Sequence, residues 1–316
     1  MNIDLSEEAR EYGRVAQQAL EAAGGDRLVE DAEREPDRRA DRVAPALAEL
    51  GAWDLDPRSG ADELEAAAAL CRAAGWWAVP YPVAERLCRP RDLEAEGLVV
   101  VGDSRPAARV AGLGGRWVAV TLDGHRRLAT PRPPLEPPRK SAFVADLDLE
   151  PAGPDADAPA LDVALGLVLP CWTLLGMLDR AIALTTAYVQ ERQQFGQPLA
   201  AFQGVQFQLT DAEVERAGVA ELAHHALWSI EANRLDAVAD ALALRLAAIE
   251  GAETVFRVTH QLHGAIGFCD ETTLSWLSRH SQPLRRLPLA LSATRERLTR
   301  QVGRRGLAGL FDAVAP

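Results

Sequence analysis

The chain has 316 residues, of which 48% are hydrophobic and 25% are charged, a balance typical of soluble globular proteins with more than one domain. Its net charge of -12 excludes a general binder of nucleic-acid backbones, because such a protein needs a basic surface. Four widely spaced cysteines match no zinc-binding pattern, and the acidic N-terminus does not resemble a signal peptide, so we expect a cytoplasmic location.

Residues 1–95 are predicted to form a helical N-terminal domain. Apolar residues recur every three or four positions over residues 5–24, and Ser6 is placed to cap the first turn of that helix. The same periodicity predicts three further helices, over residues 42–55, over residues 61–77 with Gly75 at the end, and over residues 81–87.

Residues 96–152 have a different composition, which predicts a small β domain. Short runs of β-branched and apolar residues are separated there by Gly, Pro and Asp, which are turn signals. The expected strands lie within residues 98–104, 116–124 and 141–149. Residues 131–140, PRPPLEPPRK, are too rich in proline for a central strand and are expected to form a loop.

Residues 153–316 are predicted to form an antiparallel four-helix bundle, because long amphipathic segments follow one another with short loops between them. The expected helices span residues 160–193, 203–233, 236–264, 269–281 and 288–312. Only residues 160–178 approach the length of a membrane span, but Asp162 and Pro170 interrupt this apolar run. We therefore expect a buried core helix and no membrane span. The fold class is mainly α with a small β middle domain.

Residues 188–211, YVQERQQFGQPLAAFQGVQFQLTD, join the first two of these long helices through an unusual corner. Gly196 and Pro198 end the preceding helix, which leaves Arg192 and Phe195 at the corner. A guanidinium group matches a pair of phosphate oxygens, an aromatic ring can stack on a base, and amides can bind a ribose or a base edge. These groups suit a dinucleotide. A solvated helix end with Phe195 in the core would explain the same spacing.

Residues 260–271, HQLHGAIGFCDE, form a second junction between helices. Gly264 and Gly267 permit close approach of the backbone. His260 and His263 share one helix face at a spacing that could serve a metal, but the sequence offers no third ligand. Alone, this stretch indicates a helix C-cap and nothing more.

Together the two stretches resemble the two signatures of acyl-CoA dehydrogenases, ERxQFGxPLxxFQxxQFxLAD and QxHGGxGFxxExxLxxxxRD, and the domain order agrees with that family. Members are FAD flavoenzymes with the same helical, β and helical domains. The resemblance implies that the matching residues contact the adenine and pyrophosphate parts of an FAD seated in a neighbouring subunit. Those residues are Arg192, Gln194, Phe195, Leu199, Phe202 and Gln203 from the first signature, and Gln261, His263, Gly264 and Gly267 from the second.

The resemblance does not extend to the catalytic base. The family desaturates an acyl-CoA thioester between its α- and β-carbons and uses a glutamate to remove the α-proton. The two positions at which the family carries this glutamate correspond to Gly166 and Pro288, and neither is acidic. The nearby carboxylates Asp162, Asp270 and Glu271 match no catalytic position. The middle domain is also about half the family's usual length, so the resemblance assigns this chain no catalytic residue.

Three interpretations follow from the resemblance. In the first, the chain is one subunit of a heteromeric α2β2 acyl-CoA dehydrogenase of the kind known from bacterial steroid side-chain degradation. A longer partner then supplies the glutamate and most of the acyl-CoA site. In the second, the chain is a non-catalytic homomer with a structural or regulatory role. In the third, the fold serves another flavin reaction, such as nitroalkane oxidation, or a DNA-associated role that the negative charge opposes. The heteromer is favoured because the chain retains the residues, here called the flavin arm, that would contact the FAD of a neighbouring subunit.

Overall fold

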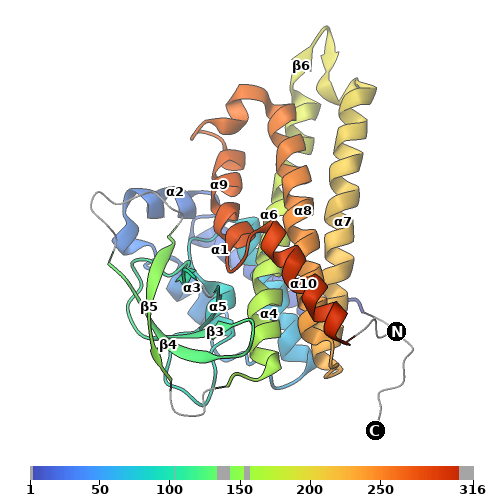
Figure 1. Ribbon diagram of the computed structural model, residues 1–316. Helices are drawn as coiled ribbons and strands as arrows, with labels where there is room; N and C mark the ends of the chain where they lie inside the picture. Colours follow the sequence, from blue (N-terminus) through green and yellow to red (C-terminus); the bar gives the residue numbers. More distant parts are fainter. Residues whose placement is uncertain (1–2, 103, 134–142, 153–156, 306–316) are drawn as a thin grey trace.

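The computed structural model describes residues 3–102, 104–133, 143–152 and 157–305, and it is mainly helical with one small sheet (Figure 1). Short helices come first, the sheet follows, and long helices complete the chain, which is the predicted order. Figure 1 shows the sheet packed beside the long helices and next to the N-terminal helices.

The N-terminal region forms helices because its apolar residues return to one face every three or four positions. Ser6 caps the first helix as predicted, since its hydroxyl accepts a hydrogen bond from the N–H of Ala9 at 3.3 Å. The segment over residues 27–34 is too short and too charged for the apolar periodicity to predict it. The helices are α1 (Glu7–Ala23), α2 (Arg27–Arg34), α3 (Val43–Glu49), α4 (Ala61–Trp76) and α5 (Val83–Leu87), with a 3-10 turn at Pro36–Arg38.

Gly75 lies in the last turn of α4, which ends at Trp76, close to the predicted helix end. At this point α4 crosses α6 (Ala160–Glu191) in direct backbone contact. A Cβ atom at Gly75 would lie 1.9 Å from the carbonyl oxygen of Thr173, and one at Gly176 would lie 1.9 Å from that of Arg72. The absence of both side chains lets the two helices touch, and this contact joins the N-terminal helices to the bundle.

The β region forms a five-stranded sheet with the order β1-β3-β4-β5-β2. Strand β1 runs parallel to β3, and the other neighbours are antiparallel. Alternate residues of a strand face opposite sides, so Leu98 and Val100 join the main core while Val99 and Val101 join a smaller core around Trp117. The strands are β1 (Leu98–Val101), β2 (Ala107–Ala108), β3 (Trp117–Thr121), β4 (Arg126–Pro131) and β5 (Ala145–Pro151).

Strand β4 corrects the prediction of a loop that begins at residue 131. Pro131 is the last residue of β4 and pairs with Leu147 of β5, although β4 lies between β3 and β5. Proline is tolerated there because the strand ends at that residue and needs no further ladder hydrogen bond from it. Residues 134–140 of the expected loop lie outside the described residues. So do residues 141–142 of the third expected strand and the last expected helix beyond residue 305.

The C-terminal region forms the predicted helical bundle. Figure 1 shows α6, α7 and α8 side by side, with α10 crossing the outside of α8. The helices are α6, α7 (Gln203–Glu231), α8 (Ala237–His263), α9 (Thr273–Arg286) and α10 (Leu291–Arg305), with a 3-10 turn, η3, at Gly264–Phe268. By length and composition α6 could cross a membrane, but 83% of its most apolar window is buried within the protein. It is the core helix that the sequence predicts.

Candidate functional site

The corner between α6 and α7 is a short β-hairpin that projects from one end of the bundle (Figure 1). Its strands are β6 (Gln193–Gln194) and β7 (Gln197–Pro198), and its turn residues Phe195 and Gly196 have φ angles of 52° and 81°. Tight hairpin turns of this kind need two positive φ angles, which for a non-glycine residue cost about 1–3 kcal/mol. Phe195 is 92% exposed, so the interpretation in which it fills the core is wrong. The hairpin therefore exposes this aromatic ring to solvent although the backbone of Phe195 is strained.

Arg192 stands at the base of this hairpin on a fixed backbone. Its N–H donates to the carbonyl of Tyr188 at 2.8 Å, and its carbonyl accepts from the N–H of Leu199 at 2.8 Å. The guanidinium group is exposed, and it forms no hydrogen bond or ion pair within the described part of the chain. An unpaired, forked cation on a rigid support is suited to a phosphate or carboxylate ligand.

The other residues of the first signature divide into two groups. Gln194 and Gln203 are exposed beside Arg192 and Phe195. Leu199 is partly buried against the main core, and Phe202 packs its ring edge-on against Phe195 at a centroid distance of 6.2 Å. The exposed residues are therefore available to a ligand, whereas Leu199 and Phe202 hold the hairpin in place.

The second signature lies at the same end of the bundle because His263 stacks on Tyr188. The two rings are 4.4 Å apart and inclined by 14°, which joins the end of α8 to the end of α6. His263 Nδ1 lies 2.9 Å from the carbonyl oxygen of Thr259. Burial lowers the pKa of His263 despite this carbonyl, so the ring is neutral at physiological pH. A neutral ring that donates through Nδ1 keeps Nε2 as an acceptor.

The glycines of the second signature have different environments. Gly264 has a φ of 66° and is exposed, with no atom within 4 Å of a Cβ placed there. Gly267 is buried, and a Cβ there would lie 2.9 Å from the Cβ of His263. Gly264 thus presents open backbone, and Gly267 serves the packing of η3. Gln261 is exposed nearby, and His260 stacks on Phe268 at 4.2 Å.

Exposed apolar side chains also lie on α7 and η3, and they were not among the predicted site residues although Phe207 and Phe268 belong to the two signatures. Phe207 and Val214, which lie seven residues apart on one face of α7, are 59% and 63% exposed. Ile266 and Phe268 of η3 are 48% and 68% exposed. The seven-residue spacing of Phe207 and Val214 in the sequence could have predicted that both side chains lie on one face of α7. Clustered exposed apolar side chains mark interaction surfaces in soluble proteins.

Gly166 and Pro288, which correspond to the family's two glutamate positions, line one cavity between the sheet and the bundle. The cavity has a volume of about 40 Å³, far below the roughly 300–1,000 Å³ of a typical ligand pocket. A Cβ at Gly166 would lie 2.5 Å from Val100 Cγ2, so a longer side chain does not fit. Arg245 donates to the carbonyls of Leu284 at 3.0 Å and Leu289 at 2.7 Å, which fastens the α9–α10 turn over the cavity.

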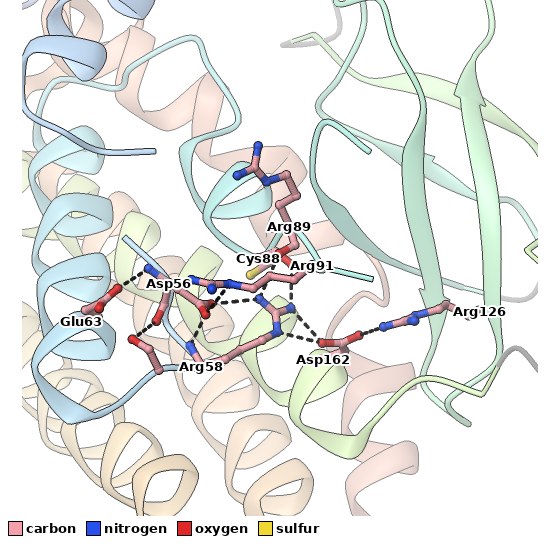
Figure 2. A network of polar contacts seen from close by, with 9 residues as sticks. Asp56, Arg58, Glu63, Cys88, Arg89, Arg91, Arg126 and Asp162 are labelled. Atoms are coloured by element: carbon pink, nitrogen blue, oxygen red, sulfur yellow. Dashed lines mark hydrogen bonds and ion pairs between the residues drawn. The ribbon is translucent and has the colours of Figure 1, made fainter. Parts of the chain in front are cut away.

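Asp162, the carboxylate nearest to this region in sequence, has a structural role. It is 2% exposed and lies between two arginines, as Figure 2 shows. Its Oδ1 accepts from Arg58 Nη2 at 2.8 Å, and its Oδ2 accepts from Arg126 Nη2 at 2.6 Å. Arg58 also donates to the carbonyl of Cys88 at 2.7 Å. The network connects the N-terminal helices, the sheet and α6, and it engages both carboxylate oxygens of Asp162 with arginines.

Residues 168–288 match the family model of the acyl-CoA dehydrogenase C-terminal domain. This range includes both signatures, and it includes Arg245 of α8 and Pro283 and Leu284 of α9, which line the cavity from the bundle side. Residues 168–288 of the chain are therefore an acyl-CoA dehydrogenase C-terminal domain. Among curated relatives, the probable acyl-CoA dehydrogenase YngJ of Bacillus subtilis (strain 168) is 33% identical over 97 residues, 31% of this chain and 25% of that protein. The chain thus spans about a quarter of the length of the curated relatives that it matches.

Solved structures show the family fold over nearly the whole chain. A variant of the Tcur3481-Tcur3483 steroid ACAD superposes with a TM-score of 0.78 at 21% identity, covering 95% of this chain and 99% of that one. The ChsE4-ChsE5 complex from Mycobacterium tuberculosis gives a TM-score of 0.74 at 18% identity, covering 97% of this chain and 100% of the matched chain. These superpositions agree with the predicted fold class.

The acyl-CoA dehydrogenase family and its structural neighbours indicate FAD as the cofactor. The donor set at the hairpin fits one end of this molecule, since it combines a cation for phosphate, an exposed aromatic ring and several amides. The cavity of about 40 Å³ does not fit the other end, because a flavin ring and an acyl chain need several hundred cubic ångströms. The groups on the hairpin therefore fit a phosphate and a planar base.

Proposed function

We propose that this chain is a subunit of an FAD-dependent acyl-CoA dehydrogenase and contributes half of a flavin site that it shares with a longer partner subunit. The proposal rests on two observations together: the hairpin residues are exposed, and the cavity at the family's glutamate positions is small. Arg192 and Phe195 are exposed on a constrained hairpin, while the cavity at Gly166 and Pro288 admits no acyl chain. A chain that served its own flavin would need that interior open.

The arm's residues would each take a role that their chemistry supports. Arg192 would pair with the pyrophosphate through its forked donors, and Phe195 would stack on the adenine. Gln194, Gln203 and Gln261 would bind the ribose or the base edge through their amides, and the open backbone at Gly264 would approach the phosphates. His263, Gly267, Leu199 and Phe202 would position these groups through the contacts described above.

The proposed reaction is α,β-desaturation of an acyl-CoA thioester, in which bound FAD supplies the acceptor for the β-hydride. The partner's glutamate would remove the α-proton, because the family's two glutamate positions are Gly166 and Pro288 in this chain and Asp162 is held by two arginines. This chain would then bind and orient the cofactor and contribute no catalytic residue. The steroid ACAD among the neighbours supports a steroid side-chain CoA as the substrate class.

The exposed apolar surface of α7 and η3 supports a partner on this face. Phe207, Val214 and Phe268 would be covered by the second subunit, as expected for the apolar centre of an interface. The ChsE4-ChsE5 complex is a neighbour composed of two different chains, which supports a hetero-oligomer. We further propose that residues 1–95, 96–152 and 153–316 are the domains of this subunit. The protonated, unpaired thiols of Cys71, Cys88 and Cys171 support a cytoplasmic location.

Co-expression with a longer acyl-CoA dehydrogenase encoded in the same genome tests this function. The expected result is a yellow complex with one FAD per pair of subunits and acyl-CoA-dependent dye reduction, whereas each chain alone lacks both. If the protein is colourless and no acyl-CoA dehydrogenase of greater length copurifies with it, the result would instead support the non-catalytic homomer. Stoichiometric FAD and desaturation by this chain alone would contradict the proposal outright.

A further inference from the structure

The small cavity between the sheet and the bundle is lined by two buried arginines. Arg109 follows β2 and is 6% exposed, and Arg245 lies in α8 and is 2% exposed. A third, Arg39, is 4% exposed and donates to the backbone carbonyl of Arg109 at 3.4 Å. Guanidinium groups are rarely buried without carboxylate partners, so this concentration of cations needs an explanation.

Arg109 has no counterion at contact distance. Its guanidinium forms no hydrogen bond or ion pair with the residues that the structure describes, and its Nε is buried without an acceptor. Arg86 and Arg297 also have an unpartnered Nε, but each forms an ion pair through a terminal nitrogen. Arg245 uses its terminal nitrogens on backbone carbonyls, and its own Nε is unpartnered. Two donors without acceptors therefore belong to side chains that line one cavity.

The local charges do not balance. Glu85 lines the same cavity and attracts Arg109 through space, but burial raises its pKa and so opposes its negative charge. Burial and then repulsion from Arg109 lower the pKa of Arg39 to about 9, which leaves it charged at neutral pH. Among the described residues that line the cavity, Glu85 is the one carboxylate beside the cations of Arg109 and Arg245, and Arg39 adds a third cation next to Arg109. Buried charges in proteins are paired as a rule, and a missing negative charge is the simplest resolution.

We propose that this cavity binds a small monovalent anion, which Arg109 and Arg245 hold by hydrogen bonds. About 10–15 Å³ of such space accommodates one water molecule, so about 40 Å³ holds roughly three. That room suits a halide or a short carboxylate such as formate, and it excludes gluconate and nucleotides. The anion would neutralise the interior at the place where the family keeps its reactive groups. The proposal does not depend on the flavin arm, which lies at the far end of α6.

Thermal unfolding of the full chain at constant ionic strength tests the anion site. Sodium gluconate is replaced stepwise by sodium chloride in one series and by sodium formate in another. An anion that binds only the folded protein raises Tm by about 5–10 °C at a hundredfold excess over Kd, and the rise continues with the logarithm of its concentration. The series in which Tm begins to rise at the lower concentration identifies the preferred anion, and chloride and formate together should raise Tm by less than the sum of their separate effects, because they compete for one site. A Tm that does not change in either series would overturn the proposal.

Two variants assign the effect to Arg109. In Arg109→Met the dependence of Tm on chloride or formate should disappear. In gluconate this variant should unfold no earlier than the parent, because repulsion from Arg39 is removed. Arg105→Gln is the matched control, because Arg105 is exposed four residues away and should leave the dependence unchanged. An equal loss of Tm in all salts for Arg109→Met would show a purely structural arginine. A crystal of the unmodified protein grown in sodium bromide should show anomalous density beside Arg109, and its absence would contradict the site.

Discussion

Replacing Asp162 by asparagine should destabilise the protein strongly. The side chain keeps its size but loses its charge, so Arg58 and Arg126 are left facing each other without their shared counterion. Asp162 is 2% exposed, and both contacts are short, at 2.8 Å and 2.6 Å. Removing one partner from a buried ion pair costs about 3–5 kcal/mol, a large part of a typical folding free energy of about 5–15 kcal/mol.

The matched control is Asp148→Asn, because Asp148 pairs with Arg132 at a similar distance of 2.6 Å but both side chains are more than half exposed. An exposed pair contributes about 0–1 kcal/mol. Calorimetry should therefore show a decrease in Tm of at least about 6 °C for Asp162→Asn and about 2 °C or less for the control. Adding Arg126→Gln to Asp162→Asn should cost less than the sum of the two single changes. Equal shifts for the two aspartates would refute the assignment of Asp162 as a buried junction.

Three further predictions follow from other contacts. In the partnered complex, Arg192→Ala should weaken FAD binding by about 2–5 kcal/mol, roughly thirty- to several-thousand-fold, as measured by flavin release on dilution. Gly176→Ala should lower stability by at least about 1–3 kcal/mol in thermal unfolding, because its Cβ would lie 1.9 Å from the carbonyl oxygen of Arg72. Burial lowers the pKa of His280, so the unfolded chain binds the proton more readily. Stability should therefore fall as pH decreases below about 6.5, and His280→Gln should reduce that slope in urea titrations at successive pH values.

Each of these predictions has its own control. Arg192→Lys should recover only part of the affinity, because an ammonium keeps the charge but not the fork, and full colour in Arg192→Ala would exclude the arm from the flavin site. Gly218→Ala, on an open face of α7, should leave stability unchanged or raise it by about 0.5–1 kcal/mol. If both glycine variants behave alike, the α4–α6 crossing is looser than described. An unchanged pH slope in His280→Gln would assign the titration to His224, His260 or His263, whose pKa values burial also lowers.

The long helices were predictable because their apolar periodicity extends over many turns and glycines or prolines mark their ends. Helix α6 was expected over residues 160–193 and spans Ala160–Glu191. Strand β4 was not expected, because its sequence RRLATP carries few apolar residues and most of them are not buried. Gly75 was expected at a helix end and lies in the last turn of α4, but sequence alone cannot show that a second glycine, a hundred residues later, faces it across a helix crossing.

The sequence predicted which residues belong to the candidate site, but it did not predict their exposure or their long-range contacts. The signatures identified Arg192 and Phe195, but only the structure shows that Phe195 stands in solvent at a positive φ angle. The closed cavity depends on Arg109 and Arg245, which come from different regions and have no shared motif. The partners of Asp162 lie 104 and 36 residues away in sequence, so no local pattern could reveal that it is fully engaged. Long-range packing decides such features.

Helix α6 carries Gly166 near its beginning and Arg192 at its end, and about 1.5 Å of rise per residue separates them by roughly 40 Å. The small cavity and the exposed hairpin therefore lie at opposite ends of the same helix. Substitutions that fill the interior at one end leave the geometry of the other end untouched, because the helix between them is buried and braced along its length. A duplicated gene could lose the first function in steps while selection kept the second. The division of labour between two chains would then need no new fold and no new surface, only the loss of one of two insulated sites.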